Sequence, residues 1–299
     1  MRYFVAHGEH RRLDQATRDE LRGSFVQCSD GVTHYELTGP ADGELVVLAG
    51  GLTIPLFYWD AFAEELHGRG YRTLAYSGYG RGYSDRVLTA YDEALFVRQL
   101  SDLIERLDST GPWHVLGTSM GALVALGFVE RHIEQTATLT LVGPGGLETK
   151  PPAGAGLMRH DRVGALLGKY LGNRMLQNHL SHNVRDPQRS AALSAMVREC
   201  YEFEGSMYAL LATIADFGLT ARQDLYARVG ASPVPSMLLW GDEDHVTPII
   251  RFDEVRNLLA PMESHVIEEC GHMAPYERPV EVAAKFGAFA DRAGRRAQR

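Results

Sequence analysis

Short apolar runs alternate with amphipathic segments along most of this chain. Compact runs of valine, leucine and aromatic residues predict strands, whereas apolar residues that recur every three or four positions predict helices. We predict strands at residues 24–28, 32–37, 44–49, 71–76, 112–116, 136–142, 235–240 and 264–268. We predict helices at residues 14–22, 58–66, 90–107, from 122 onward, 249–259 and 279–293.

Strands that alternate with helices are typical of a parallel sheet with helices on both faces. The first two strands are an exception, because they are joined by a short turn at Asp30 and Gly31 that predicts a hairpin. We therefore predict an α/β fold with a mostly parallel eight-stranded sheet. Ligands of such folds bind beyond the carboxyl ends of the strands.

The alternation stops between residues 143 and 232. This stretch opens with Gly/Pro-rich segments and then predicts helices at 163–170, 174–180, 189–204 and 207–217. We predict that residues 24–147 and 228–299 form the core and that residues 148–227 form a helical cap over the strand ends. Residues 1–23 form a polar N-terminal segment outside this core.

Composition narrows the class of protein. The 299 residues are 45% hydrophobic and 23% charged, as in a soluble globular protein. The net charge of −8 argues against a nucleic acid or an anionic membrane as the main partner. We expect no membrane span, no signal peptide and, from three unpatterned cysteines, a reduced cytoplasmic protein. His179 and His182 have a loose metal-ligand spacing without a supporting cluster, so we expect no metal and no cofactor.

The run from Gly117 to Gly121 places Ser119 between two glycines, after an apolar strand and before an Ala/Leu/Val-rich helix. A G-x-S-x-G turn in this context exposes a serine at the top of a parallel sheet. The turn is tight, so side chains two residues before or after the serine would collide with the neighbouring helix and strand. Ser119 is therefore the predicted nucleophile.

A serine hydroxyl needs an imidazole to accept its proton and a carboxylate to orient that imidazole. On this type of fold the order along the chain is serine, acid, histidine. Asp244 follows a buried strand and is the predicted acid, with Asp242 as the alternative. His272 follows Gly271 after a later strand and is the predicted base.

Two backbone N–H groups are predicted to hold the oxyanion that forms when the serine attacks a carbonyl group. One belongs to Met120, directly after the nucleophile. The other belongs to Gly51, in the loop that follows the strand at 44–49.

With these motifs in place, the chain from about Ser24 to Ala293 resembles the α/β-hydrolase superfamily, in its esterase, lipase and aminopeptidase-like branch. The segments that carry the resemblance are 117–121, 240–244, 271–272 with 277–279, and the glycine-rich turn at 80–85. The resemblance implies a Ser-Asp-His triad. The chain departs from the usual pattern in having Ala49-Gly50 where many members have His-Gly, and Ser77 where many have aspartate.

We predict a serine hydrolase that cleaves a carboxylic ester of a small to medium, largely apolar molecule through an acyl-serine intermediate. The residues predicted to contact the substrate are Leu52, Tyr170, Met175, Tyr201, Met207 and Phe217. An aminopeptidase-like activity, with Glu199, Glu202 and Glu204 near a substrate amine, is one alternative. The same triad could hydrolyse a carbon–carbon bond of a diketone. A third alternative is a ligand sensor without catalytic activity.

Overall fold

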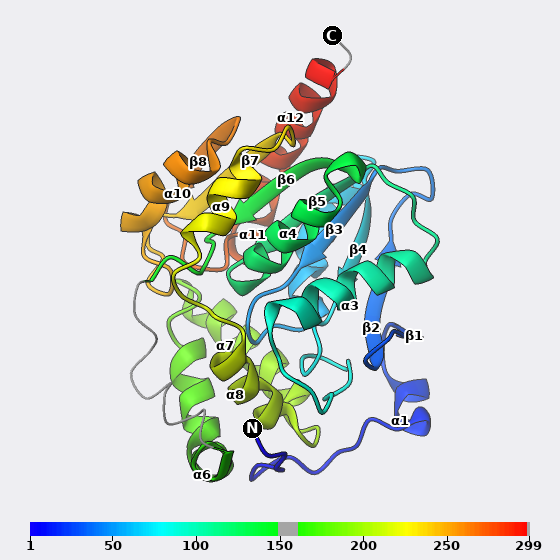
Figure 1. The fold of residues 1–299 in the computed structure, drawn as a ribbon, viewed down its shortest axis with the longest axis vertical. Coiled ribbons are helices and arrows are strands. Elements are labelled where there is room, and N and C mark those ends of the chain that lie inside the picture. The colour runs from blue at the N-terminus through cyan, green and yellow to red at the C-terminus, as the bar shows by residue number, and fades with distance from the viewer. Residues whose placement is uncertain (149–160, 298–299) are drawn as a thin grey trace.

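The computed structural model describes residues 1–148 and 161–297, and its centre is a twisted sheet of eight strands (Figure 1). In spatial order the strands are β1 (Ser24–Gln27), β2 (Val32–Thr38), β4 (Arg72–Tyr76), β3 (Leu45–Ala49), β5 (Trp113–Thr118), β6 (Thr136–Val142), β7 (Ser236–Gly241) and β8 (Glu263–Ile267). The β1–β2 and β2–β4 pairs are antiparallel, and the remaining pairs are parallel. The predicted fold class is confirmed.

Helices bury both faces of the sheet, as consecutive residues of β5 illustrate. Val115 packs in one apolar cluster with α4, whereas Leu116 packs in a second cluster with Phe286 of α12. This two-sided burial explains why the central strands have apolar residues at nearly every position. The first face carries α3 (Glu93–Arg106), α4 (Met120–Arg131), α9 (Gln223–Gly230) and α10 (Phe252–Leu259), and the second carries α2 (Asp60–His67), α11 (Ala274–Glu277) and α12 (Pro279–Ala297).

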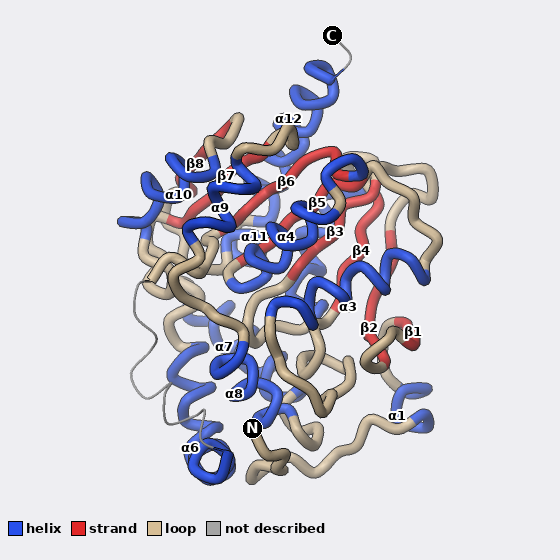
Figure 2. The backbone as a smooth tube through the Cα atoms, viewed as in Figure 1, coloured by secondary structure: helices blue, strands red, loops and turns tan. Residues whose placement is uncertain are grey.

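Three helices of the predicted cap lie together beyond one end of the sheet: α6 (Asp161–Leu180), α7 (Pro187–Cys200) and α8 (Ser206–Asp216) (Figures 1 and 2). The prediction of two helices between 163 and 180 is wrong, because α6 is continuous. Its Gly172 packs so closely on α8 that an added Cβ would lie 2.5 Å from the sulfur of Met207. Helix α9 was not predicted. Residues 151–154, part of the Gly/Pro-rich stretch, lie outside the described residues.

The N-terminal segment runs along the cap before it reaches α1 (Gln15–Glu20) and the sheet (Figure 1). The carboxylate of Glu9 is buried and accepts hydrogen bonds from the backbone N–H groups of Gly205 and Met207 at the start of α8, at 2.9 and 2.6 Å. The amide of Asn173 in α6 donates to the carbonyl oxygen of His7 at 2.8 Å. The segment therefore joins α6 to α8.

Short 3₁₀ turns complete the core: η1 (Leu56–Trp59), η2 (Ile133–Gln135) and η3 (Ile249–Arg251). Within residues 1–148 and 161–297, the helices are too short or too polar to cross a lipid bilayer.

Candidate active site

Ser119 occupies a strained turn between β5 and α4. Its φ of 56° and ψ of −122° are unusual for a residue with a side chain. Both flanking glycines are sterically required. A Cβ on Gly117 would lie 2.4 Å from the carbonyl oxygen of Gly121, and a Cβ on Gly121 would lie 2.2 Å from that of Ala49. The predicted collisions with the adjacent helix and strand are thus confirmed.

Asp244 and His272 form a buried pair at the same end of the sheet. Asp244 lies in the turn after β7, His272 lies after β8, and the two residues are 3% and 2% exposed. The ring nitrogen Nδ1 of His272 lies 2.8 Å from Asp244 Oδ2. Asp244 Oδ1 accepts the backbone N–H groups of Val246 and Thr247 at 2.9 and 2.8 Å. These donors fix the carboxylate, which in turn fixes the orientation and tautomer of the imidazole.

The loop that follows β6 lies between this pair and Ser119. The backbone N–H of Gly145 donates to the carbonyl oxygen of Ser119 at 3.1 Å. Two residues earlier, a Cβ on Gly143 would lie 3.0 Å from Asp244 Oδ2 and 3.3 Å from His272 Nδ1. Among the described residues no hydrogen bond joins the Ser119 hydroxyl to His272, so contact between these two side chains stays a prediction.

The two predicted oxyanion donors flank Ser119. An added Cβ on Gly51 would lie 3.2 Å from Ser119 Cβ and 3.7 Å from Ser119 Oγ. Met120 begins α4, so its N–H has no acceptor one helical turn earlier. Both positions suit donors to an oxyanion next to Ser119 Oγ, and their role stays a prediction.

The alternative acid, Asp242, has a different partner. Its Oδ1 accepts the backbone N–H of Cys270 at 3.1 Å and so connects the turns after β7 and β8. Ser77, which stands where related chains often have aspartate, accepts the backbone N–H of Leu56 at 3.1 Å and lies 3.1 Å from His34 Nδ1. Both residues hold loops in place.

The residues predicted to contact the substrate separate into two groups. Tyr201 and Met207 are buried in the apolar cluster that spans the cap and the core, with Leu52 and Met175 half-buried against it. Tyr170 is 70% exposed because it lies on the opposite face of α6 from Gly168 and Gly172, so its contact with the substrate stays a prediction. Phe217 belongs to the other cluster and packs against Phe96 of α3 at 5.6 Å between ring centroids, so we assign it a packing role.

Two polar residues next to the Asp–His pair were not predicted. The hydroxyl of Thr247 lies 2.8 Å from Asp244 Oδ2 and 3.2 Å from His272 Nδ1. The backbone carbonyl of Asn183, in the turn between α6 and α7, accepts the N–H of His272 at 3.0 Å. The Asn183 side chain is fully buried, and neither polar atom of its amide has a hydrogen-bond partner. No sequence motif marks either residue.

Titratable groups of the cap bear on the metal-ligand spacing of His179 and His182 and on the aminopeptidase-like alternative. Burial lowers the pKa of His179 to about 4, with smaller contributions from His272 and His182. The imidazole of His179 is therefore neutral at pH 7. Glu202 and Glu204, two of the three glutamates considered for binding a substrate amine, form ion pairs with Arg11 and Arg12 of the N-terminal segment, at 3.7 and 2.9 Å. The residues that the structure describes contain no cluster of three or more metal-ligating side chains.

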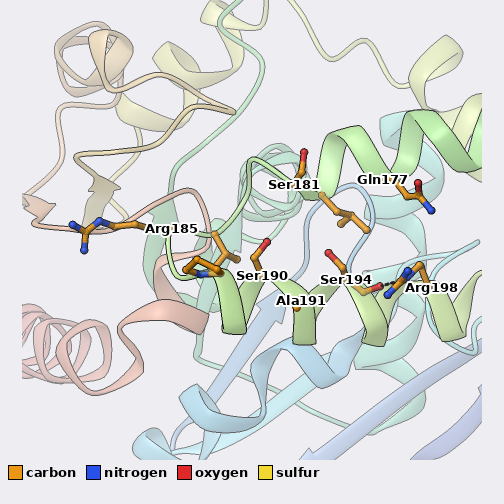
Figure 3. Close-up of a pocket in the computed structure, with 10 residues that line it drawn as sticks. Gln177, Ser181, Arg185, Ser190, Ala191, Ser194 and Arg198 are labelled. Carbon is orange, nitrogen blue, oxygen red and sulfur yellow. Dashed lines mark hydrogen bonds between the residues drawn. The ribbon is translucent and has the colours of Figure 1, made fainter.

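A cavity of about 440 Å³ lies within the cap, between α6, α7 and the turn that joins them (Figure 3). Its walls include Gln177, Leu180, Ser190 and Arg198. None of its lining residues belongs to the predicted triad.

A serine on a strained strand–helix turn, with an Asp–His pair after two later strands, is the arrangement of hydrolases built on a parallel sheet. Residues 45–285 match the sequence profile described as "Alpha/beta hydrolase family". The chain belongs to this family, as predicted.

Comparison with individual proteins agrees with this assignment. The chain is 28% identical over 282 residues to the 2-hydroxy-6-oxononadienedioate/2-hydroxy-6-oxononatrienedioate hydrolase of Cupriavidus pinatubonensis, covering 88% of this chain and 93% of the relative. It is 23% identical over 267 residues to the 2-hydroxy-6-oxo-6-phenylhexa-2,4-dienoate hydrolase of Comamonas testosteroni, covering 86% and 91%. The structure of a thermophilic esterase from Thermogutta terrifontis has a TM-score of 0.76 at 21% identity, covering 91% of this chain and 99% of the esterase.

Proposed function

We propose that this hydrolase uses Ser119 to cleave the carbon–carbon bond beside the ketone of a 2-hydroxy-6-oxo-dienoate. The observation that carries the proposal is the buried Asp244–His272 pair, set beside the Ser119 turn at one end of the sheet. The chemical class of the substrate comes from relatives that cover most of this chain and hydrolyse such compounds. Cleavage of this carbon–carbon bond therefore replaces ester hydrolysis, which we predict from the sequence, as our first candidate reaction.

The chemistry follows from the placement of these groups. With the substrate in its 2-oxo form, Ser119 Oγ adds to the ketone carbon while His272 accepts the serine proton. The N–H groups of Gly51 and Met120 stabilise the oxyanion. When the carbonyl re-forms, the bond to the neighbouring carbon breaks, and its electron pair is delocalised along the chain to the 2-oxo oxygen.

His272 completes the cycle. The released dienolate takes up the proton held by His272 and leaves as a 2-hydroxydienoate. Neutral His272 then deprotonates a water molecule that attacks the acyl-serine, which releases a carboxylic acid and restores the Ser119 hydroxyl. One water molecule is consumed and no redox partner is needed.

The amide of Asn183 supports a substrate with polar groups. An unpaired buried polar group costs about 1–3 kcal/mol, so such a group is expected to meet a ligand or an ordered water molecule. Asn183 adjoins the backbone of His272, and a carboxylate or enol oxygen of the substrate could pair with its N–H₂ group.

Hydrolysis of a carboxylic ester is the second candidate. It is favoured by the aromatic ring of Tyr201 and the side chain of Met207, which are buried where the cap meets the core. The same nucleophile, base and oxyanion donors serve both reactions, because each passes through an acyl-serine.

A paired assay separates the two candidates. We expect kcat/KM for a 2-hydroxy-6-oxo-dienoate, followed by loss of its chromophore, to exceed kcat/KM for p-nitrophenyl esters of graded acyl length. Ser119→Ala should lower either activity by about 10⁴–10⁶-fold without unfolding the protein. Faster turnover of an ester would instead make the ester the substrate class. A Ser119→Ala protein with unchanged activity would contradict the serine mechanism.

A further inference from the structure

We propose that Arg81 is a positioning residue that holds the oxyanion loop, residues 50–53, in place and joins it to the cap. This inference rests on the proposed function, in which the N–H of Gly51 stabilises the oxyanion. Arg81 lies in the glycine-rich turn after β4 and is 1% exposed. Its Nε donates to the carbonyl oxygen of Leu52 at 2.7 Å, and its Nη2 donates to Thr213 Oγ1 of α8 at 2.9 Å.

The oxyanion loop has little else to hold it. Ala49, Gly50 and Gly51 offer no polar side chain, and two consecutive glycines leave the backbone with wide conformational freedom. The hydroxyl of Thr53 is buried without a hydrogen-bond partner. Within residues 1–148 and 161–297, the side-chain hydrogen bond that reaches residues 50–53 comes from Arg81. This bond fixes the peptide unit that begins at Leu52, one residue beyond Gly51.

The surroundings of Arg81 are unusual for a buried cation. Its third hydrogen bond goes from Nη1 to the carbonyl oxygen of Tyr79 at 2.8 Å, and its guanidinium lies 5.2 Å from the ring centre of Phe96. All three hydrogen-bond acceptors are neutral, so no carboxylate offsets the cost of burying the charge. If Arg81 served only for packing, an apolar side chain at this position would avoid the free-energy cost of burying a charge. A planar guanidinium, however, can direct N–H groups to three segments at once.

Thr213 extends this connection into the cap. Its hydroxyl donates to the carbonyl oxygen of Ala209 one turn earlier in α8, at 2.8 Å, which leaves its lone pairs free for Arg81. A single side chain therefore contacts the oxyanion loop, the glycine-rich turn and a cap helix. The position of α8 and the direction of the Gly51 N–H are coupled through it.

Arg86, directly after the same turn, provides a matched control. Its guanidinium donates to Gly82 O, Cys200 O and Ser206 Oγ at 2.9, 3.0 and 2.8 Å. It thus joins the glycine-rich turn to Cys200, the last residue of α7, and to Ser206, the first residue of α8. None of its hydrogen bonds reaches the oxyanion loop, so its loss should affect stability and not the oxyanion.

The experiment compares Arg81→Met, Arg86→Met and wild type. A trifluoromethyl ketone, which adds to the serine and forms an oxyanion, probes the loop directly, whereas the product carboxylic acid probes binding that needs no serine addition. We expect Arg81→Met to lower kcat and the affinity for the trifluoromethyl ketone in parallel, by about 10²-fold, as for loss of an oxyanion donor. KM and product affinity should change by no more than about threefold. Arg86→Met should lower Tm while leaving both inhibitor affinities within about threefold of wild type.

A second pair keeps the proposal testable if Arg81→Met does not fold. Thr213→Val removes the acceptor for Arg81 and should reproduce part of the loss, whereas Thr213→Ser should retain wild-type affinity for the trifluoromethyl ketone. A lower Tm with unchanged kcat and inhibitor affinity in the Arg81 and Thr213 variants would overturn the positioning role. Failure of the wild type to bind the ketone would instead contradict the serine mechanism.

Discussion

Replacement of Asp244 by asparagine separates the catalytic role of the carboxylate from its contribution to folding. The Oδ1 atom of Asp244 accepts the N–H groups of Val246 and Thr247 at 2.9 and 2.8 Å. The carbonyl oxygen of an asparagine amide can accept both of these bonds. The turn after β7 should therefore keep its conformation in Asp244→Asn.

The chemistry should change at the other oxygen. The amide N–H₂ group would replace Asp244 Oδ2, which now lies 2.8 Å from His272 Nδ1. Because N–H₂ is a donor, Nδ1 would have to accept a hydrogen bond and the ring proton would move to Nε2. That tautomer cannot take the proton of Ser119. We expect kcat/KM to fall by about 10⁴-fold, or roughly 5.5 kcal/mol of transition-state stabilisation, with little change in Tm.

The assay measures kcat/KM, the rate of labelling of Ser119 by a fluorophosphonate, and Tm. Asp242→Asn is the matched control on the same turn. Asp242 accepts the Cys270 N–H through Oδ1, and an amide oxygen can keep that bond, so its activity should stay within about threefold of wild type. The reasoning is refuted if Asp244→Asn keeps its activity within about tenfold, or if Asp242→Asn loses as much.

Three further predictions follow from backbone sterics, buried charge and burial of histidine. Gly121→Ala should lower Tm and abolish labelling of Ser119, because its methyl group would lie 2.2 Å from the carbonyl oxygen of Ala49; normal labelling would contradict the steric argument. Glu9→Ala should destabilise the protein by about 2 kcal/mol in chemical unfolding, because the N–H groups at the start of α8 that donate to the Glu9 carboxylate lose their acceptor. An unchanged denaturation midpoint would show that this contact is dispensable. Burial lowers the pKa of His34 to about 3, so the fold keeps it neutral while the unfolded chain takes up a proton below its ordinary pKa of about 6.5. The free energy of unfolding should therefore be highest above pH 6.5 and should fall by a few kcal/mol towards pH 3. His34→Gln should reduce this fall. An identical pH profile in the variant would rule out a contribution from His34.

Local patterns predicted the features that depend on neighbouring residues. Alternation of strands and helices gave the sheet, and the two glycines around Ser119 gave the strained turn, because both are encoded within a few positions. Its place after a late strand, behind Gly271, and the order serine, acid, histidine along the chain indicated which of the 12 histidines to choose.

Contacts between distant segments could not be predicted in this way. We predict a break between residues 170 and 174, whereas α6 is continuous there and its Gly172 lets the helix approach Met207 of α8. Tyr170 is predicted to contact the substrate because its type suits an apolar site, and on the continuous helix its side chain is exposed. Thr247 and Arg81 act through hydrogen bonds to residues that the fold alone brings near, so the sequence did not indicate the role of either, although Arg81 lies in the glycine-rich turn at 80–85.

The central claim is that an acyl group passes through Ser119 when the substrate is cleaved. Rapid acid quenching during turnover, followed by peptide mass spectrometry, tests it most directly. We predict a mass increase equal to the acyl fragment on the peptide that contains Ser119, and no such increase in Ser119→Ala. Turnover at full rate with the acyl group on another residue, or with no covalent intermediate in wild type or in a variant slowed at deacylation, would contradict the account.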